Sequence, residues 1–169
     1  GALPRLTAHE HKNEIYLTDT VELAAAEGLA RVVVHKDFAE VQGVNDRWEL
    51  ACARQVLQRA VVEAHARSGV DFIQPDGVVI DVQVEISPDV TIGPSVVLEG
   101  NTRIGAGTRV DAFCHLRDAE IGEGVSVHSH SVCESAVVED HASIGPYARL
   151  RPGSRVCSTA RVGNFVEMK

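Results

Sequence analysis

The chain has 169 residues, which is enough for one domain and part of another. Its net charge of −8 is shared evenly, because residues 1–79 and residues 80–169 each hold 8 basic and 12 acidic side chains. This balance excludes a surface that coats nucleic acid. The sequence has no run of eighteen apolar residues and no signal-peptide pattern, so we expect no membrane partner.

Cysteine usage adds a second exclusion. The four cysteines, Cys52, Cys114, Cys133 and Cys157, are far apart and form no C-x-x-C pair. This spacing is typical neither of a zinc site nor of a disulfide-rich secreted domain. We therefore expect reduced thiols and a cytoplasmic location, with no cysteine acting as a nucleophile.

The first 45 residues alternate between helical and strand-like patterns. Asp19 and Glu22 have the spacing of a capping box, which predicts a short helix that ends at Gly28. Residues 31–35 then read as a buried strand. A segment this short cannot bury a core of its own, so it is interpreted as the tail of a larger α/β domain.

A longer helix is predicted over residues 46–69. Asp46 and Glu49 form a second capping box, and Gly69 marks the end. Apolar residues recur at helical spacing and predict one buried face, made of Leu50, Ala53, Leu57, Ala60, Val61 and Ala64. This helix is expected to link the first segment to the rest of the chain.

From Ile80 onward an aliphatic residue returns at every sixth position. The first run is Ile80, Ile86, Ile92, Leu98, Ile104, Val110 and Leu116, and the second is Val138, Ile144, Leu150, Val156, Val162 and Met168. Small residues recur two places before many of them, at Thr102, Thr108, Ala142, Ala148, Ser154 and Ala160. This short fixed repeat is typical of a parallel β-helix built from hexapeptides.

The geometry of such a repeat follows from its period. Each hexapeptide makes one face of a triangular prism, so three faces make a coil of about 18 residues, and neighbouring coils pair as parallel strands about 4.8 Å apart. β-Hairpins would alternate by two and do not produce this period. The rhythm slips through Leu116, Ile121, Val127, Val132 and Val138, which predicts two irregular corners.

The last coil carries an unusual concentration of positive charge. Arg149, Arg151, Arg155, Arg161 and Lys169 are accompanied there only by Glu167. Arg151 and Lys169 are one coil apart, and each directly follows a core aliphatic residue, so they are predicted to occupy the same corner of adjacent coils. Cys133 lies at the matching place of the preceding coil by the 18-residue count. Two stacked cations predict a phosphate-binding site.

Four strings in the sequence carry a family resemblance. They are N-E-I-Y-L-T-D at 13–19, G-V-N-D-R at 43–47, A-R-L-R-P-G at 148–153 and V-G-N-F-V-E-M-K at 162–169. In this order and spacing the chain resembles the GlmU family. The resemblance implies the tail of a nucleotidyltransferase domain in 1–45, a linker helix in 46–69 and the first coils of a left-handed β-helix acetyltransferase domain in 70–169. The left hand is implied by the resemblance alone, since the general crossover rule favours the right hand.

The resemblance also implies two reactions. Enzymes of this family transfer an acetyl group from acetyl-CoA to glucosamine-1-phosphate. They then transfer a uridyl group from UTP to N-acetylglucosamine-1-phosphate with Mg²⁺, which makes UDP-N-acetylglucosamine for peptidoglycan and lipopolysaccharide. They are homotrimers. The family's nucleotide loop and acidic metal ligand are expected before Gly1, and its catalytic histidine and acetyl-CoA coils after Lys169, so we expect the chain alone to be inactive.

The resemblance assigns roles to individual residues. Asn45 matches a ligand of magnesium and the nucleotide sugar, although a lone Asn is a weak Mg²⁺ ligand and could equally be a loop or cap residue. Glu14, Tyr16 and Thr18 match the lining of the sugar pocket, with a polar strand end as the alternative. Arg151 and Lys169 match the residues that hold the sugar phosphate in acetyl transfer.

Other readings stay open at this stage. His115, His128, His130 and His141 raise the possibility of zinc between subunits, but their order favours exposed corner residues. The chain could also belong to another hexapeptide acyltransferase or sugar nucleotidyltransferase, or serve as a structural β-helix for assembly. A simple acyltransferase does not need the strings at 13–19 and 43–47, and a structural module does not need a paired-cation site.

Overall fold

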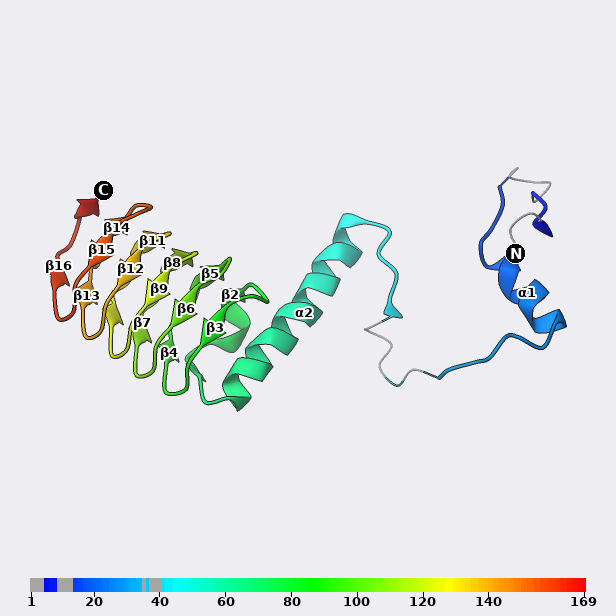
Figure 1. The fold of residues 1–169 in the computed structure, drawn as a ribbon, viewed down its shortest axis with the longest axis horizontal. Coiled ribbons are helices and arrows are strands. Elements are labelled where there is room, and N and C mark those ends of the chain that lie inside the picture. The colour runs from blue at the N-terminus through cyan, green and yellow to red at the C-terminus, as the bar shows by residue number, and fades with distance from the viewer. Residues whose placement is uncertain (1–4, 9–13, 35, 37–40) are drawn as a thin grey trace. The chain divides into compact units, whose positions relative to one another are not determined.

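The computed structural model describes residues 5–8, 14–34, 36 and 41–169, which divide into two compact units, 1–42 and 43–169 (Figure 1). The described part of the first unit contains α1 (Asp19–Ala26). The second contains α2 (Arg47–Arg67), a short 3₁₀ helix η3 (Pro75–Gly77) and strands β1 to β17. The solenoid of parallel strands confirms the mainly β fold that the hexapeptide period predicts.

The first unit bears out its helix but not its strand. The N-cap of α1 is Thr18, one residue before the expected cap at Asp19. Its side chain makes no capping hydrogen bond, and Gly28 follows the end of the helix with φ +71°. Residues 31–34 form no strand, and the side chain of Val32 is 93% exposed. A buried strand requires a neighbour for its backbone groups and a surface for its side chains, and the described residues provide neither. His35, the last residue of the predicted strand, lies outside the described residues.

The long helix begins after Asp46, as the capping box predicts, but the residues that it buries are not the predicted apolar face. Asp46 caps α2 by accepting a hydrogen bond of 2.8 Å from the backbone N–H of Glu49. Val62 is the buried residue of this helix, and Val61 packs against the core beside it. Most of the predicted apolar face is exposed, including Leu57 at 53%. Gln58, Val61 and Val62 of α2 contact the first coil, so burial follows contact with that coil rather than helical periodicity.

The strands stack into three parallel sheets, here called face 1, face 2 and face 3 (Figure 1). Face 1 contains β1 (Asp71–Phe72), β4 (Thr91–Ile92), β7 (Arg109–Val110), β10 (Ser126–Val127), β13 (Ser143–Ile144) and β16 (Arg161–Val162). Face 2 contains β2 (Val79–Ile80), β5 (Val97–Glu99), β8 (His115–Arg117), β11 (Val132–Glu134), β14 (Arg149–Leu150) and β17 (Glu167–Met168). Face 3 contains β3 (Glu85–Ile86), β6 (Arg103–Ile104), β9 (Glu120–Ile121), β12 (Val137–Val138) and β15 (Arg155–Val156).

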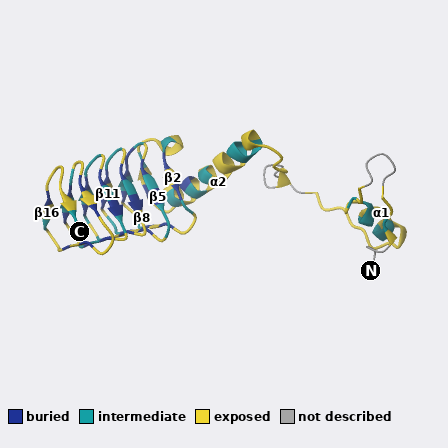
Figure 2. Ribbon diagram, turned by 90° about the horizontal axis from the view of Figure 1, so that it is seen from above, coloured by how far each residue is buried: buried dark blue, intermediate teal, exposed yellow. Residues whose placement is uncertain are grey.

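The interior of the prism is an aliphatic column. Ile80, Ile92, Leu98 and Leu116 are fully buried, while the turns between strands are largely exposed (Figure 2). At some corners the next coil approaches so closely that only glycine fits. A Cβ on Gly105 would lie 2.6 Å from the carbonyl carbon of Gly122.

Two corners are one residue short, as the slip in the aliphatic rhythm predicts. The second short corner lies after residue 133, however, and not before Val132 as the rhythm predicts. Leu116 pairs with Cys133, and Cys133 pairs with Leu150, so these coils have 17 residues. Cys133 is 0% exposed and occupies the inward position, whereas Val132 lies on the outer side of the strand. The aliphatic character of Val132 was misleading, because a cysteine behaves as a small apolar residue when it is buried.

Buried hydroxyl groups tie neighbouring coils together. Thr108 Oγ1 donates to the carbonyl of Gly122 at 2.8 Å and accepts from the N–H of Val125 at 3.0 Å. Thr102 and Ser131 accept in the same way from the N–H groups of residues in the following coil. Ser154 Oγ is equally buried but has no partner among the described residues.

Candidate functional site

The register of β14 and β17 places Arg151 and Lys169 as predicted. Leu150 pairs with Met168, and Arg151 donates its backbone N–H to the carbonyl of Met168 at 3.1 Å. Arg151 and Lys169 each follow one member of this pair, so they occupy equivalent positions on adjacent coils, about 4.8 Å apart in the stacking direction. Both are exposed. Their juxtaposition is a property of the fold, whereas their binding of phosphate stays a prediction.

Glu167 modifies this pair of cations. Its carboxylate lies 3.7 Å from the guanidinium of Arg151, and the two side chains are about half exposed. A surface ion pair of this kind contributes about 0–1 kcal/mol. Lys169 makes no ion pair within the described part of the chain. An anion that binds at this corner would therefore compete with Glu167 for Arg151. It would not have to displace a carboxylate from Lys169.

The neighbour on the other side of Arg151 differs from the sequence expectation. Because the coil has 17 residues, Glu134 and not Cys133 precedes Arg151 in the stack. Glu134 accepts hydrogen bonds from Arg117 at 2.6 Å and from Arg149 at 3.1 Å. The column of cations is thus bounded by a carboxylate that is already engaged, so the predicted anion site is limited to Arg151 and Lys169.

The basic patch of the last coil is smaller than its residue count suggests. Arg149 is paired with Glu134, and Arg155 donates to Glu139 at 2.8 Å. The hydrogen bond from Arg155 is the main reason that the pKa of Glu139 is lowered, with smaller contributions from Ser158. Arg161 has no ion-pair partner among the described residues and belongs to face 1, away from the strand that precedes Lys169.

Asn45 lies at the start of α2. Its backbone N–H donates to Glu49 at 2.6 Å, and the adjacent Asp46 caps the helix through Glu49. The nearby carboxylates are therefore engaged with the helix terminus. A neutral amide oxygen alone does not meet the preference of Mg²⁺ for carboxylate ligands. The described residues around Asn45 do not form a magnesium site by themselves.

The other residues assigned to the nucleotide-sugar site belong to the first unit. The hydroxyl of Tyr16 donates to Glu14 at 3.2 Å, and Thr18 precedes α1. Tyr16 is half-buried, whereas Glu14 and Thr18 are exposed. Asn45 belongs to the second unit, so no geometry joins it to these three residues.

The histidines take two kinds of position. His130 and His141 are exposed corner residues with φ of +63° and +59°, as expected. His115 lies on β8, where Nε2 is 2.8 Å from a carboxylate oxygen of Glu99. His128 is half-buried on face 1 and contacts two other side chains, a grouping that sequence reasoning missed. Among the described residues no group of three or more His, Cys, Asp or Glu could hold a metal ion.

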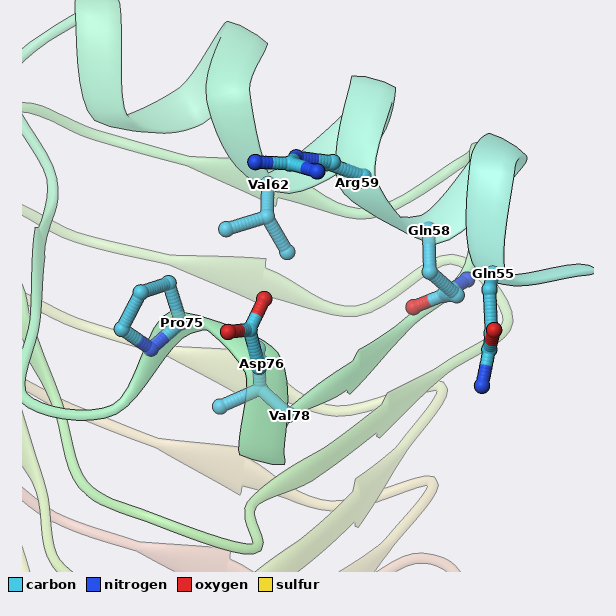
Figure 3. Close-up of a pocket in the computed structure, with 7 residues that line it drawn as sticks. All are labelled: Gln55, Gln58, Arg59, Val62, Pro75, Asp76 and Val78. Atoms are coloured by element: carbon cyan, nitrogen blue, oxygen red, sulfur yellow. The ribbon is translucent and has the colours of Figure 1, made fainter.

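A cavity of about 310 Å³ opens between α2 and the first coil (Figure 3). It is lined by Gln55, Gln58, Arg59, Val62, Pro75, Asp76 and Val78. Figure 3 shows Val62 pointing down from the helix toward Pro75 and Asp76, with the side chain of Arg59 extended along the helix above it. None of the residues predicted to bind substrate lines this cavity. The cavity lies where α2 meets the first coil. Arg151 and Lys169 lie at the opposite end of face 2.

Comparison with known proteins gives a family. Residues 74–169 match the family model of the GMPPB C-terminal domain. The chain is 43% identical over 169 aligned residues to the bifunctional protein GlmU of Alkalilimnicola ehrlichii, and 40% identical over 167 residues to that of Nostoc sp.. Each alignment covers 99% of this chain but 36% of the relative, so the chain spans about a third of their length.

Solved structures give weaker matches. A perosamine N-acetyltransferase mutant from Caulobacter crescentus, in complex with CoA and GDP-perosamine, covers 65% of this chain and 61% of its own, with 16% identity and a TM-score of 0.38. Among the described residues, the helices lack the combination of length and apolar character that a membrane span requires. Through residues 74–169 the chain belongs to the family of the GMPPB C-terminal domain, and over 99% of its length its resemblance to GlmU is confirmed.

Proposed function

We propose that this chain is part of a GlmU-type enzyme and supplies the sugar-phosphate corner of its acetyltransferase. The observation that carries the proposal is the register of Leu150 with Met168, which stacks Arg151 on Lys169. The 43% identity to a bifunctional GlmU supports it. The proposed reaction is acetyl transfer from acetyl-CoA to the amino group of glucosamine-1-phosphate.

The two cations have different parts in this proposal. The planar guanidinium of Arg151 suits a bidentate contact with phosphate, whereas Lys169 acts as a point charge. When phosphate binds, Arg151 replaces its 3.7 Å contact with Glu167 by charge-assisted hydrogen bonds to the phosphate. The corner then fixes one end of the sugar and leaves its amino group free to react elsewhere in the enzyme.

Uridyl transfer from UTP to N-acetylglucosamine-1-phosphate is the second proposed activity, and it rests on the GlmU resemblance. Asn45, Glu14, Tyr16 and Thr18 are its proposed nucleotide-sugar contacts. The residues around Asn45 do not form a magnesium site alone, so Asn45 would hold Mg²⁺ only together with carboxylate ligands from elsewhere in the enzyme. We also propose a cytoplasmic homotrimer, for which light scattering at several concentrations is the test; a concentration-independent monomer would contradict it.

The acetyltransferase proposal is tested in a protein that contains this chain within a full GlmU-type sequence. Arg151→Ala and Lys169→Ala should each lower kcat/KM for acetyl transfer by roughly ten- to a hundredfold, as expected for loss of one charge-assisted contact, and leave uridyl transfer unchanged. Arg161→Ala is the matched control, because it removes, from another face, a cation with no ion-pair partner among the described residues. Unchanged acetyl transfer in both test variants would reject the assignment.

The isolated 169-residue chain offers an independent test. We expect no turnover with acetyl-CoA and glucosamine-1-phosphate, or with UTP, N-acetylglucosamine-1-phosphate and Mg²⁺. Titration with inorganic phosphate, followed by NMR shifts of the backbone amides, should perturb residues near Arg151 and Lys169. Clear turnover would show that the chain carries more of the enzyme than proposed, and absence of any shift would argue against the phosphate corner.

A further inference from the structure

Three polar side chains on face 1 form a line of hydrogen bonds across successive coils. Nδ1 of His128 lies 3.2 Å from Oδ2 of Asp111, and Nε2 of His128 lies 3.3 Å from Oγ of Ser143. Asp111 directly follows β7, His128 directly follows β10 and Ser143 lies in β13. Serine, histidine and aspartate in this order are the groups that nucleophilic serine enzymes use.

The acidic end of the line is held in place. Oδ1 of Asp111 accepts a hydrogen bond of 2.8 Å from Nε of Arg109, so both carboxylate oxygens are engaged. An ionised carboxylate only accepts hydrogen bonds, so its contact with His128 requires a proton on Nδ1. Nε2 of the neutral ring then carries a lone pair and accepts the hydroxyl proton of Ser143. This assignment follows from the hydrogen-bond network.

The backbone keeps the three residues in register. Asp111 donates its N–H to the carbonyl of Val127 at 2.8 Å, and His128 donates its N–H to that of Ile144 at 2.8 Å. Groups placed on paired strands are positioned more accurately than groups on loops. The side chain of His128 is 43% exposed, so a small molecule can reach the line from solvent.

An arginine occupies the position next to Ser143 on the following coil. Ser143 pairs in register with Arg161 of β16, whose side chain has no ion-pair partner among the described residues. Positive charge at this position would stabilise the negative oxygen that forms when a hydroxyl attacks an ester carbonyl. Arg161 is exposed and can adjust toward such an oxygen.

We propose that Ser143, His128 and Asp111 form a nucleophilic site that accepts acyl groups from small activated esters. Oγ of Ser143 bonds to the carbonyl carbon while its proton passes to Nε2 of His128, and the carbon–oxygen bond to the leaving alcohol breaks. The proton then goes to the departing oxygen or to water, and an acyl-serine remains. Hydrolysis by water, with His128 again taking the proton, releases the carboxylic acid and restores the serine. The site is independent of the sugar-phosphate corner.

The test uses the intact chain and p-nitrophenyl acetate. Release of p-nitrophenolate is followed by absorbance, and the position of the acetyl group is mapped by peptide mass spectrometry after acid quenching. We expect acetylation at Ser143, with Ser143→Ala and His128→Asn at least tenfold slower in acylation. Asp111→Asn should slow it as well, because the amide can hold the wrong ring tautomer. Acetyl groups confined to lysines or to the chain terminus would overturn the proposal.

Ser126→Ala is the matched control. Ser126 pairs in register with Ser143 and is likewise half-buried, but its side chain makes no hydrogen bond to His128. It should label like the unmodified chain, and an equal loss in Ser126→Ala and Ser143→Ala would contradict a specific nucleophile. Far-UV circular dichroism checks folding. Should Ser143→Ala fail to fold, Ser143→Cys replaces it, with acetylation expected on the new thiol; a thiol that stays unmodified while lysines react would overturn the site.

Discussion

The side chain of Gln58 and the backbone of Ile80 exchange two hydrogen bonds of 2.8 Å each. Oε1 accepts from the N–H of Ile80, and Nε2 donates to its carbonyl. β2 is the edge strand of face 2, so these backbone groups have no neighbouring strand on that side. One amide side chain of α2 therefore satisfies the open edge of the solenoid, and it does so beside the cavity under the helix.

Replacement of Gln58 tests this edge. Gln58→Ala leaves the N–H and C=O of Ile80 without their partner in a partly buried place, which should cost about 1–3 kcal/mol in the free energy of unfolding. Gln55→Ala is the control, since Gln55 lines the same cavity and is exposed. It should stay within about 0.5 kcal/mol of the parent in urea unfolding. Equal effects of the two substitutions would mean that the pairing contributes nothing specific.

Buried hydroxyls provide a second comparison. Thr108→Val keeps the shape of the side chain but removes its bonds to Gly122 and Val125, so we expect a loss of about 1–3 kcal/mol in unfolding free energy. Ser154→Ala removes a hydroxyl that is buried without a partner among the described residues, so the stability should be unchanged or higher. Denaturant unfolding measures both. A larger loss at Ser154 than at Thr108 would refute the comparison.

The solenoid could be predicted because its physics is local and repeated. Every inward position needs an apolar side chain at nearly constant spacing, so Ile80 to Leu116 expose the period directly in the sequence. The capping box at Asp46 is equally local and located the start of α2. The stacking of Arg151 on Lys169 followed from the same period, because the last coil has the regular 18-residue length.

The structure departs from the sequence prediction at positions where residue burial depends on contacts with neighbouring coils rather than on local sequence. The aliphatic rhythm predicts Val132 at one inward position, whereas Cys133 occupies it, because the short corner follows β11. That one-residue shift also moved Glu134 into the column of Arg151. The line from Asp111 to His128 depends on the same 17-residue coil length, so a fixed count of 18 could not find it. In α2 the apolar periodicity predicts the helix correctly, but it does not predict which residues of the helix are buried against the solenoid.

The cysteines should differ sharply in reactivity. Burial raises the pKa of the Cys114 thiol to about 11 and that of the Cys133 thiol to about 12, whereas Cys157 is exposed. The thiolate is the reactive form, so at pH 8 the folded chain should modify Cys157 with Ellman's reagent well before Cys114 and Cys133. Rapid reaction of all four thiols without denaturant would contradict the burial of two of them.

The same raised pKa values predict a dependence of stability on pH. The unfolded chain releases these thiol protons near 9.0, whereas the folded chain retains them up to about 11 at Cys114. The contribution to stability is therefore complete below pH 9 and declines as the pH rises from there toward 11. Cys114→Ala in urea unfolding at pH 8 and pH 10 should show a smaller decline than the parent chain. An identical decline would assign the effect to other groups.

A ladder of four rings at one corner carries the last prediction. Phe113, His130, Tyr147 and Phe165 stack on successive coils, and the ring of His130 lies 4.9 Å from that of Phe113 and 4.7 Å from that of Tyr147. The planes are nearly parallel, at 8° and 2°. Aromatic pairs contribute about 0.5–1.5 kcal/mol each beyond their buried area. His130 is placed to contribute through both of its faces.

A substitution at His141 serves as the control that separates the contribution of ring stacking from the strain of the left-handed backbone. Both histidines are exposed corner residues in the left-handed region, with φ of +63° at His130 and +59° at His141, so alanine meets the same strain at either position. His141 has no stacked ring among the described residues. His130→Ala should therefore lower the free energy of unfolding by about 1–3 kcal/mol more than His141→Ala, because it breaks two ring contacts. Urea titrations of the two variants at pH 8 give the comparison, and equal losses would show that backbone conformation, rather than the ladder, determines the stability of this corner.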